Sequence, residues 1–235
     1  MEEIKKIMLG HLANNIEVVV ITPLKSTFHS LRCELNVEKL YDKAFFENCI
    51  FRIGKKNTKG LLILSPQGIG AKDVIELFKN TNILFFGLAG SLKPKLEIGS
   101  FVEVKSTVNE KGGVTEVYAG KNFENVTCGY SPCLLGKIAK EYYSLAKSLN
   151  CDVVDMETVY CAETAIEGNN IFASLLLISD IPEVTNFWQV SELEQRRIKD
   201  GRTKAINEIK KYINLLIGVD NNERGIIDQV YRNNE

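Results

Sequence analysis

The chain has 235 residues, of which 29 are Lys or Arg and 30 are Asp or Glu, so its formal net charge at pH 7 is -1. This balance excludes a general field that would draw the whole molecule to nucleic acid or to an anionic membrane, and a small molecule is the expected partner. The six cysteines form no CxxC pair and there are only two histidines, so we expect reduced thiols and no zinc site. No apolar run approaches the ~18–20 residues of a membrane span, which predicts a soluble cytoplasmic protein.

Apolar runs of strand length recur along the chain and are separated by helix-like stretches. The runs are 16–21, 61–64, 82–86 and 171–178, with further strands expected at 101–104 and 113–118, and the helix-like stretches are 71–79, 134–149, 158–167 and 190–217. Several runs lack polar alternation, as expected where a sheet is covered on both faces. The pattern therefore predicts a mostly parallel, three-layer α/β domain.

We expect one domain, because the sequence contains no Pro/Ser-rich linker, repeat or low-complexity tract. The domain is expected to span 17–218, after an N-terminal extension, 1–16. A polar C-terminal tail, 219–235, follows and either frays or docks through its few apolar residues.

Asp180 is the strongest candidate site residue, because ligands of open α/β sheets bind beyond the carboxyl ends of the strands. It ends the apolar run 171–178 and precedes Pro182, which stops the strand. Desolvation at such a position raises the pKa of a carboxyl group toward the range useful for proton donation. The alternative is that Asp180 only caps the following turn.

Asp155, Met156 and Glu157 form a second candidate, at the start of the predicted helix 158–167. Acids at a helix start are explained by the helix dipole alone. However, an apolar side chain between two acids also suits a sugar, which has an apolar face and a hydroxylated edge. A carboxylate can accept hydrogen bonds from two neighbouring hydroxyls at once.

Two glycine turns are weaker candidates. Residues 85–91 read FFGLAGS and lie just past a predicted strand, where small residues let a ligand approach the backbone. Residues 65–70 read SPQGIG and follow another strand, but they lack the third glycine of a dinucleotide-binding turn. We interpret the second turn either as a turn that serves only packing or as a loop near the site.

Together these segments resemble those of the nucleoside phosphorylase superfamily, most closely its methylthioadenosine/adenosylhomocysteine nucleosidase branch. The matching segments occur in the family's order, at 18–25, 65–70, 86–99, 154–157 and 178–180. The resemblance implies a three-layer α/β/α fold around a mixed, largely parallel sheet, with no metal or organic cofactor. It also implies a nucleoside substrate and a homo-oligomer, for which we expect a dimer.

The resemblance further implies roles for individual residues. Asp180, helped by Ser179, would hydrogen-bond the purine at N7 and protonate it as the leaving group. Glu157 would hold the ribose 2′- and 3′-hydroxyls, with Met156 against the sugar. The other positions implied for the pocket are Asp155, Leu88, and the backbones of Ala89 and Gly90.

Departures from the family pattern concern the nucleophile and the wall of the base site. The glutamate that activates water in these nucleosidases corresponds to Thr27, whose hydroxyl is no comparable base near neutral pH. The phosphate-binding positions of the phosphorylases read Lys25, Phe85 and Leu88, and of these only Lys25 could meet an anion. Tyr130 stands where the family usually supplies an aromatic wall to the base.

We therefore expect an enzyme that cleaves the N-glycosidic bond of a purine or modified purine nucleoside of the adenosine type. Hydrolysis is favoured because the phosphate clamp is mostly missing. Phosphorolysis with inorganic phosphate bound by Lys25, and nucleoside binding without catalysis, stay open as alternatives.

Overall fold

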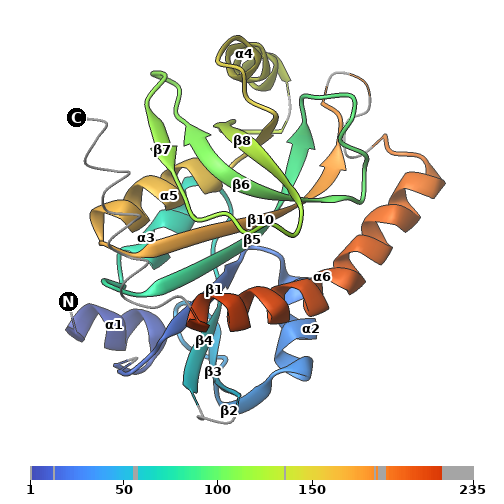
Figure 1. The fold of residues 1–235 in the computed structure, drawn as a ribbon. Coiled ribbons are helices and arrows are strands. Elements are labelled where there is room, and N and C mark those ends of the chain that lie inside the picture. The colour runs from blue at the N-terminus through green and yellow to red at the C-terminus, as the bar shows by residue number, and fades with distance from the viewer. Residues whose placement is uncertain are drawn as a thin grey trace.

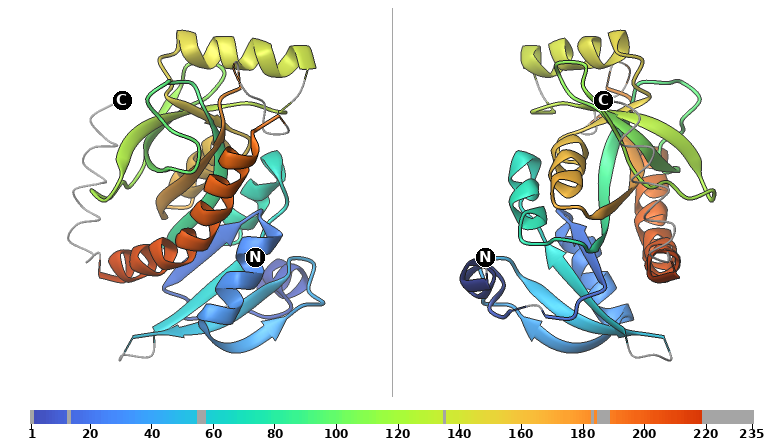
Figure 2. Two further views of the ribbon diagram at one scale, coloured as in Figure 1. Left: turned by 90° about the vertical axis from the view of Figure 1, so that its right-hand side faces the viewer. Right: turned by 60° about the vertical axis from the view of Figure 1, so that its left-hand side comes forward.

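The computed structural model describes residues 2–12, 14–54, 58–134, 136–182, 184 and 189–218. Within these residues, ten strands belong to one sheet, and helices cover both of its faces (Figures 1 and 2). The polar tail expected at 219–235 lies outside the described residues. No helix of the described chain combines the length and the apolar character needed to cross a lipid bilayer.

Strands and helices largely alternate, as the apolar runs predict. The helices are α1 (Glu2–Leu9), α2 (Lys25–Glu34), α3 (Ala71–Ile75), α4 (Gly136–Ser148), α5 (Thr158–Glu167) and α6 (Glu192–Gly218), with a 3-10 turn η1 (Gly68–Gly70) before α3. The strands are β1 (Val18–Thr22), β2 (Asn36–Tyr41), β3 (Asn48–Ile53), β4 (Thr58–Leu64), β5 (Asn82–Ser91), β6 (Phe101–Val108), β7 (Val114–Glu116), β8 (Glu124–Tyr130), β9 (Val153–Asp155) and β10 (Ile171–Asp180).

The sheet is buried on both faces, and β1 shows how. All five residues of this strand are buried. Val19 and Ile21 belong to a core cluster that also includes side chains of α3 and α5, whereas Val18 and Val20 belong to a second cluster with α2 and α6. Apolar side chains are therefore needed on both faces, which explains the unbroken run. The predicted three-layer α/β fold is confirmed.

The strand order is β10-β6-β8-β9-β5-β1-β4-β3-β2, and β7 pairs with β6. Because β5 also pairs with β10, the strands β5, β9, β8, β6 and β10 close into a ring. The pairs of β1 with β4 and β5, and of β5 with β10, are parallel, whereas β2–β3, β3–β4, β5–β9 and β6–β10 are antiparallel. The pairs β6–β8 and β8–β9 are parallel as well, so the sheet is mixed, with parallel pairs both around β1 and within the ring.

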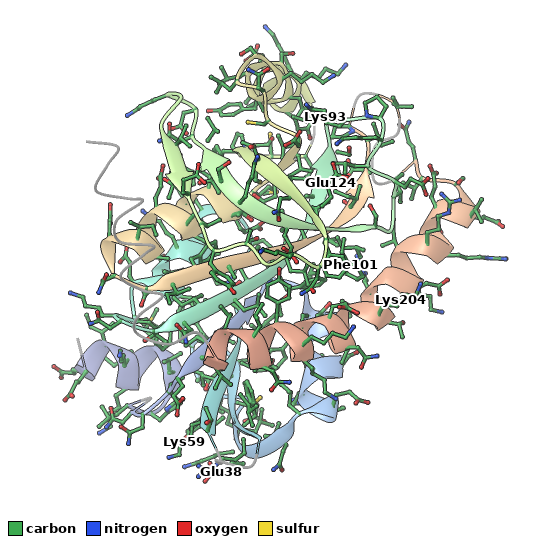
Figure 3. All side chains as sticks on the ribbon, viewed as in Figure 1. Glu38, Lys59, Lys93, Phe101, Glu124 and Lys204 are labelled. Carbon is green, nitrogen blue, oxygen red and sulfur yellow. The ribbon has the colours of Figure 1, made fainter. Side chains whose placement is uncertain are left out.

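The ends of three strands meet at one point of this ring. Gly90 near the end of β5 pairs with Val154 of β9 on one side and with Asp180 of β10 on the other. Charged side chains such as Glu38 of β2 and Lys204 of α6 are instead exposed on the outside of the molecule (Figure 3). The meeting point of β5, β9 and β10 brings two buried acids, Asp155 and Asp180, to one part of the fold.

Candidate active site

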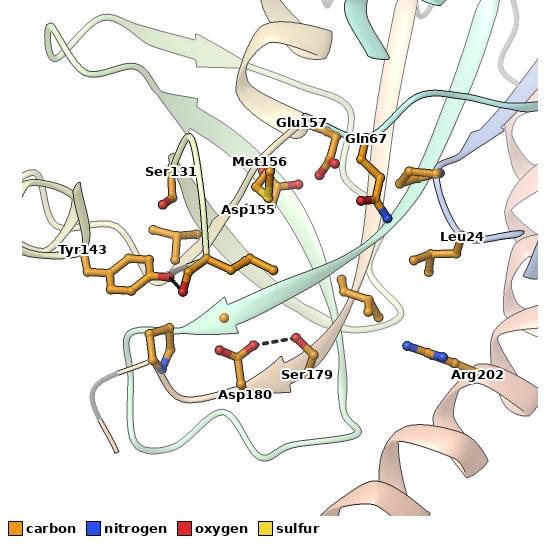
Figure 4. Close-up of a pocket in the computed structure, with 16 residues that line it drawn as sticks. Leu24, Gln67, Ser131, Tyr143, Asp155, Met156, Glu157, Ser179, Asp180 and Arg202 are labelled. Carbon is orange, nitrogen blue, oxygen red and sulfur yellow. Dashed lines mark hydrogen bonds between the residues drawn. The ribbon is translucent and has the colours of Figure 1, made fainter. Parts of the chain in front are cut away.

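A pocket of about 300 Å³ lies where β5, β9 and β10 end (Figure 4). Seven of the residues selected from the sequence line it: Leu88, Gly90, Asp155, Met156, Glu157, Ser179 and Asp180. They come from three strand ends that are up to about ninety residues apart in the chain, so the fold is what brings them together.

Asp180 is the last residue of β10, and a β-bulge sets its direction. Opposite β5, Ile178 pairs with Ala89 and Asp180 pairs with Gly90, so Ser179 is the extra residue. Bulges of this kind re-aim side chains beside a site. The Ser179 hydroxyl donates a 2.6 Å hydrogen bond to Oδ1 of Asp180 and also lies 3.3 Å from the carbonyl oxygen of Ala89 (Figure 4).

The environment of Asp180 favours its protonated form. Only 7% of the residue is exposed. Burial raises the pKa of the carboxyl group, and the hydrogen bond from Ser179 opposes this shift in part. Asp180 can therefore hold a proton at a higher pH than a surface aspartate can.

Gly90 leaves room for Pro182, which follows Asp180 closely in the chain. A Cβ atom at this position would lie 2.6 Å from Cγ of Pro182 and 3.5 Å from Oδ2 of Asp180. The first distance is too short for any side chain, so a glycine is required where β5 passes the acid. Ala89 is 2% exposed and is not among the described residues that line the pocket.

Asp155 and Glu157 flank Met156 between β9 and α5, but their carboxylates have different partners. Both oxygens of Asp155 accept hydrogen bonds from the backbone N–H of Thr158, at 3.0 and 3.2 Å, and its Oδ2 also accepts one from the Thr158 hydroxyl. Asp155 therefore caps the start of α5. Oε1 of Glu157 instead accepts a 2.7 Å hydrogen bond from the backbone N–H of Gly68.

Burial also acts on this pair of acids, which are 3% and 7% exposed. It raises the pKa of Asp155 and that of Glu157, and the nearby charge of Asp155 raises the pKa of Glu157 further. The second oxygen of Glu157 accepts no hydrogen bond from another side chain among the described residues. A pair of sugar hydroxyls could therefore bind there and stabilise the ionised form.

Among the described lining residues the aromatic ring belongs to Tyr143 of α4, and Tyr130 is not one of them. Tyr143 is 5% exposed; burial raises its pKa, and the charge of Asp180 adds to the shift. Tyr130 packs edge-on against Tyr142 and Tyr160, with ring centroids 5.8 and 4.7 Å apart. The sequence offers no signal for this exchange, because Tyr143 follows the apolar pattern of an ordinary helix face.

The nucleophile side of the pocket also differs from the expectation. Leu24 lines the pocket just before α2, whereas Lys25 and Thr27 do not appear among the described lining residues. The Thr27 hydroxyl is buried without a hydrogen-bond partner in the part of the chain that is described. Among the lining residues that the structure describes, the positive charge belongs to Arg202 of α6, which the sequence analysis did not select.

The chemistry available in the pocket is acid–base and hydrogen-bonding chemistry. The ionisable groups among the described lining residues are three buried carboxyl groups, one guanidinium group and one phenol: Asp155, Glu157, Asp180, Arg202 and Tyr143. Among the described residues, no group of three or more His, Cys, Asp or Glu side chains is arranged to hold a metal ion.

The sequence matches no protein-family model and no curated protein. The fold, however, matches those of several solved structures. One is the 5′-methylthioadenosine/S-adenosyl homocysteine nucleosidase of Campylobacter jejuni, with a TM-score of 0.69 and 13% identity over 83% of this chain and 97% of the other.

Two Helicobacter pylori structures are also similar. The protein described as MTAN gives a TM-score of 0.65 at 12% identity, over 85% of this chain and 98% of the other. Futalosine hydrolase gives 0.64 at 12% identity, over 86% of this chain and 97% of the other. This chain therefore has the fold that these proteins share.

Proposed function

We propose that this chain, which has the fold of the 5′-methylthioadenosine/S-adenosylhomocysteine nucleosidases, cleaves the bond between ribose and the base of an adenosine-type nucleoside. The observation that carries the proposal is that Asp180 and Glu157, two nearly buried carboxyl groups from separate strand ends, line one pocket of about 300 Å³. The solved structures that share the fold include nucleosidases and a futalosine hydrolase, which supports a nucleoside substrate.

Asp180 would protonate the departing base. Breaking an N-glycosidic bond builds negative charge on the base, so an acid beside the base acts on charge that is absent from the ground state. Burial raises the pKa of Asp180 and keeps a proton available, while Ser179 holds the carboxyl group in place at 2.6 Å. General-acid assistance of this kind is worth about 10²–10⁴-fold in rate.

Glu157 would hold the ribose. Its Oε1 is fixed by the Gly68 N–H, and its other oxygen can accept hydrogen bonds from the 2′- and 3′-hydroxyls. As positive charge develops on the ribose, an ionised carboxylate nearby stabilises it more strongly than it stabilises the substrate. Met156, whose Cε lies close to Gly68, offers an apolar surface to the sugar ring.

Hydrolysis is the proposed reaction. The oxygen of water forms a bond to C1′ of the ribose while the C1′–N bond breaks, and the base leaves with the proton of Asp180. The proton released by water restores Asp180 through the solvent, so the products are free base and ribose. No glutamate corresponds to the usual water-activating residue, because Thr27 occupies that position, so departure of the base would precede much of the attack by water.

A screen of nucleosides for base release, followed by chromatography, tests the proposal. The panel contains adenosine, inosine, 5′-methylthioadenosine and S-adenosylhomocysteine, and each is incubated with and without inorganic phosphate. We expect free purine from at least one of them. Tight binding without release of base after long incubation would instead identify a nucleoside-binding protein without catalysis.

A further inference from the structure

Close packing of α6 on the sheet brings Arg202 into the pocket. At Gly201, a Cβ atom would lie 2.6 Å from Cδ1 of Leu177 in β10, so the helix can approach the strand this closely only because position 201 has no side chain. The next residue, Arg202, extends from α6 into the pocket on the side of Leu24 (Figure 4). A glycine inside a helix is less favourable than an alanine, so this close approach has an energetic cost.

The guanidinium group of Arg202 has no partner among the described residues. Its Nε is fully buried and makes no hydrogen bond to any of them. No ion pair links it to a described carboxylate either, although Arg197 on the same helix pairs with Glu97 at 3.9 Å. The residue as a whole is only partly buried, but a buried Nε without a partner is unusual, because removing a polar group from water without a hydrogen bond is costly.

The carboxylates that line the pocket do not pair with the guanidinium group of Arg202. Asp180 accepts its hydrogen bond from Ser179, Glu157 from Gly68, and Asp155 from Thr158. Each acid therefore has a hydrogen-bond donor other than Arg202. The cation is left to face the cavity.

Arg202 also lies at a distinct end of the pocket. Figure 4 shows Arg202 and Leu24 on one side of Asp180, and Ser131 and Tyr143 on the other side. The proposed function places the base beside Asp180. If the base lies on the side of Asp180 where Tyr143 is, Arg202 lies on the far side, toward the sugar. A planar guanidinium group there matches two oxygens of a phosphate or carboxylate, and a partly desolvated site strengthens the attraction.

We propose that Arg202 binds an oxyanion in this pocket, either free inorganic phosphate or an anionic group carried by the nucleoside. The placement beside the sugar rests on the proposed function, whereas the binding of an anion does not. With free phosphate, a phosphate oxygen forms the bond to C1′ while the C1′–N bond breaks. The base leaves with its bonding electron pair and the Asp180 proton, and the second product is ribose 1-phosphate.

Binding measurements on four proteins test the inference. Wild type, Arg202→Gln, Arg202→Lys and Lys204→Gln are titrated with inorganic phosphate and with adenosine 5′-monophosphate, and thermal shift is recorded at an ionic strength held constant with sodium chloride. Lys204 is the matched control, because it lies two residues further along α6 and is exposed (Figure 3). A variant that fails to fold would be recognised by its melting curve without ligand.

We expect at least one anion to stabilise the wild type and Lys204→Gln equally. Arg202→Gln should bind that anion about 10- to 100-fold more weakly, and Arg202→Lys, which keeps the charge but loses the planar fork, should fall between. The inference is overturned if neither anion binds the wild type, or if Arg202→Gln binds both as the wild type does.

Base-release assays then separate the two sources of the anion. Faster release from adenosine when phosphate is added identifies free phosphate, and preference for the 5′-phosphorylated nucleoside without phosphate identifies a group on the substrate. If the wild type releases no base from any nucleoside, the proposed function fails. The binding of an oxyanion by Arg202 is judged from the titrations alone.

Discussion

The backbone N–H of Gly68 donates a 2.7 Å hydrogen bond to Oε1 of Glu157, and this contact joins two segments that are 89 residues apart. Gly68 begins the turn η1 with a φ angle of +68°, a conformation that side-chain-bearing residues seldom adopt. The direction of the Glu157 carboxylate is therefore set by backbone geometry in the loop after β4. The glycine turn at 65–70 therefore lies beside the candidate site.

Replacing Gly68 by alanine should lower both stability and activity. A left-handed conformation costs an L-residue about 1–2 kcal/mol, and relaxation of the turn would move the N–H away from Glu157. Gly54→Ala is the matched control, because Gly54 has a φ of +61° and no atom of the described residues lies within 4 Å of a Cβ at that position. Urea unfolding should show a similar loss for both variants, and kcat/KM should fall only for Gly68→Ala. An equal fall in both would contradict the role of this turn.

Asp180→Asn should reduce kcat for base release by about 10²–10⁴-fold and leave the Kd for the nucleoside within a few-fold of the wild type. The amide keeps the shape of the side chain but cannot deliver a proton to the leaving base. Single-turnover kinetics and calorimetry measure the two quantities separately. Ser179→Ala removes only the 2.6 Å hydrogen bond and should cost less. Undiminished cleavage by Asp180→Asn would show that another group protonates the base.

The role of Glu157 predicts a dependence on the ribose hydroxyls. A hydrogen bond to a charged group is worth about 1.5–3 kcal/mol, so removing the 2′-hydroxyl of the substrate should lower kcat/KM by about 10- to 100-fold. In Glu157→Gln the same change in substrate should matter much less, because the charged acceptor is gone. The measurement is kcat/KM for adenosine and 2′-deoxyadenosine in both proteins. Equal penalties in the two proteins would remove Glu157 from the sugar site.

The parts of the fold that could be predicted from the sequence are those whose burial leaves a pattern. Strands β1, β5 and β10 are buried on both faces, so their apolar runs are unbroken, and helix α5 spans the predicted 158–167. The peripheral β2 has no buried residue, and β8 mixes polar with apolar positions, so neither resembles a core strand. Helix α3 ends at Ile75 rather than near Lys79, because a turn follows at once.

The site was only partly predictable for a related reason. Asp180 and Glu157 stand out because a carboxylate at the end of a buried run requires an explanation. Arg202 does not, because an arginine on a long helix is usually exposed to solvent and its contact depends on how α6 packs. The one signal for it in the sequence is Gly201, since a glycine within a helix often marks a close approach.

The buried acids should also give the stability of the protein a characteristic pH dependence, because burial and the charge of Asp155 raise the pKa of Glu157 in the folded state above its unfolded value of about 4.5. A raised carboxyl pKa means that the folded state binds the proton more tightly. The stabilisation is therefore fully present below pH ~4.5 and is lost as the pH rises through the folded pKa. A tenfold difference in proton affinity between the two states corresponds to about 1.4 kcal/mol.

The measurement is the free energy of unfolding of Glu157→Gln and of the wild type, in urea, from pH 4 to pH 8. The difference between the two proteins should change in favour of Glu157→Gln as the pH rises and become constant above the folded pKa of Glu157. Glu38→Gln is the control of opposite sign, because Arg52 lowers the pKa of exposed Glu38, so any stabilisation that this variant lacks is present at neutral pH and its difference from the wild type should shrink as the pH falls. A constant difference between Glu157→Gln and the wild type across this range would mean that Glu157 is not held in the desolvated environment that its proposed role requires.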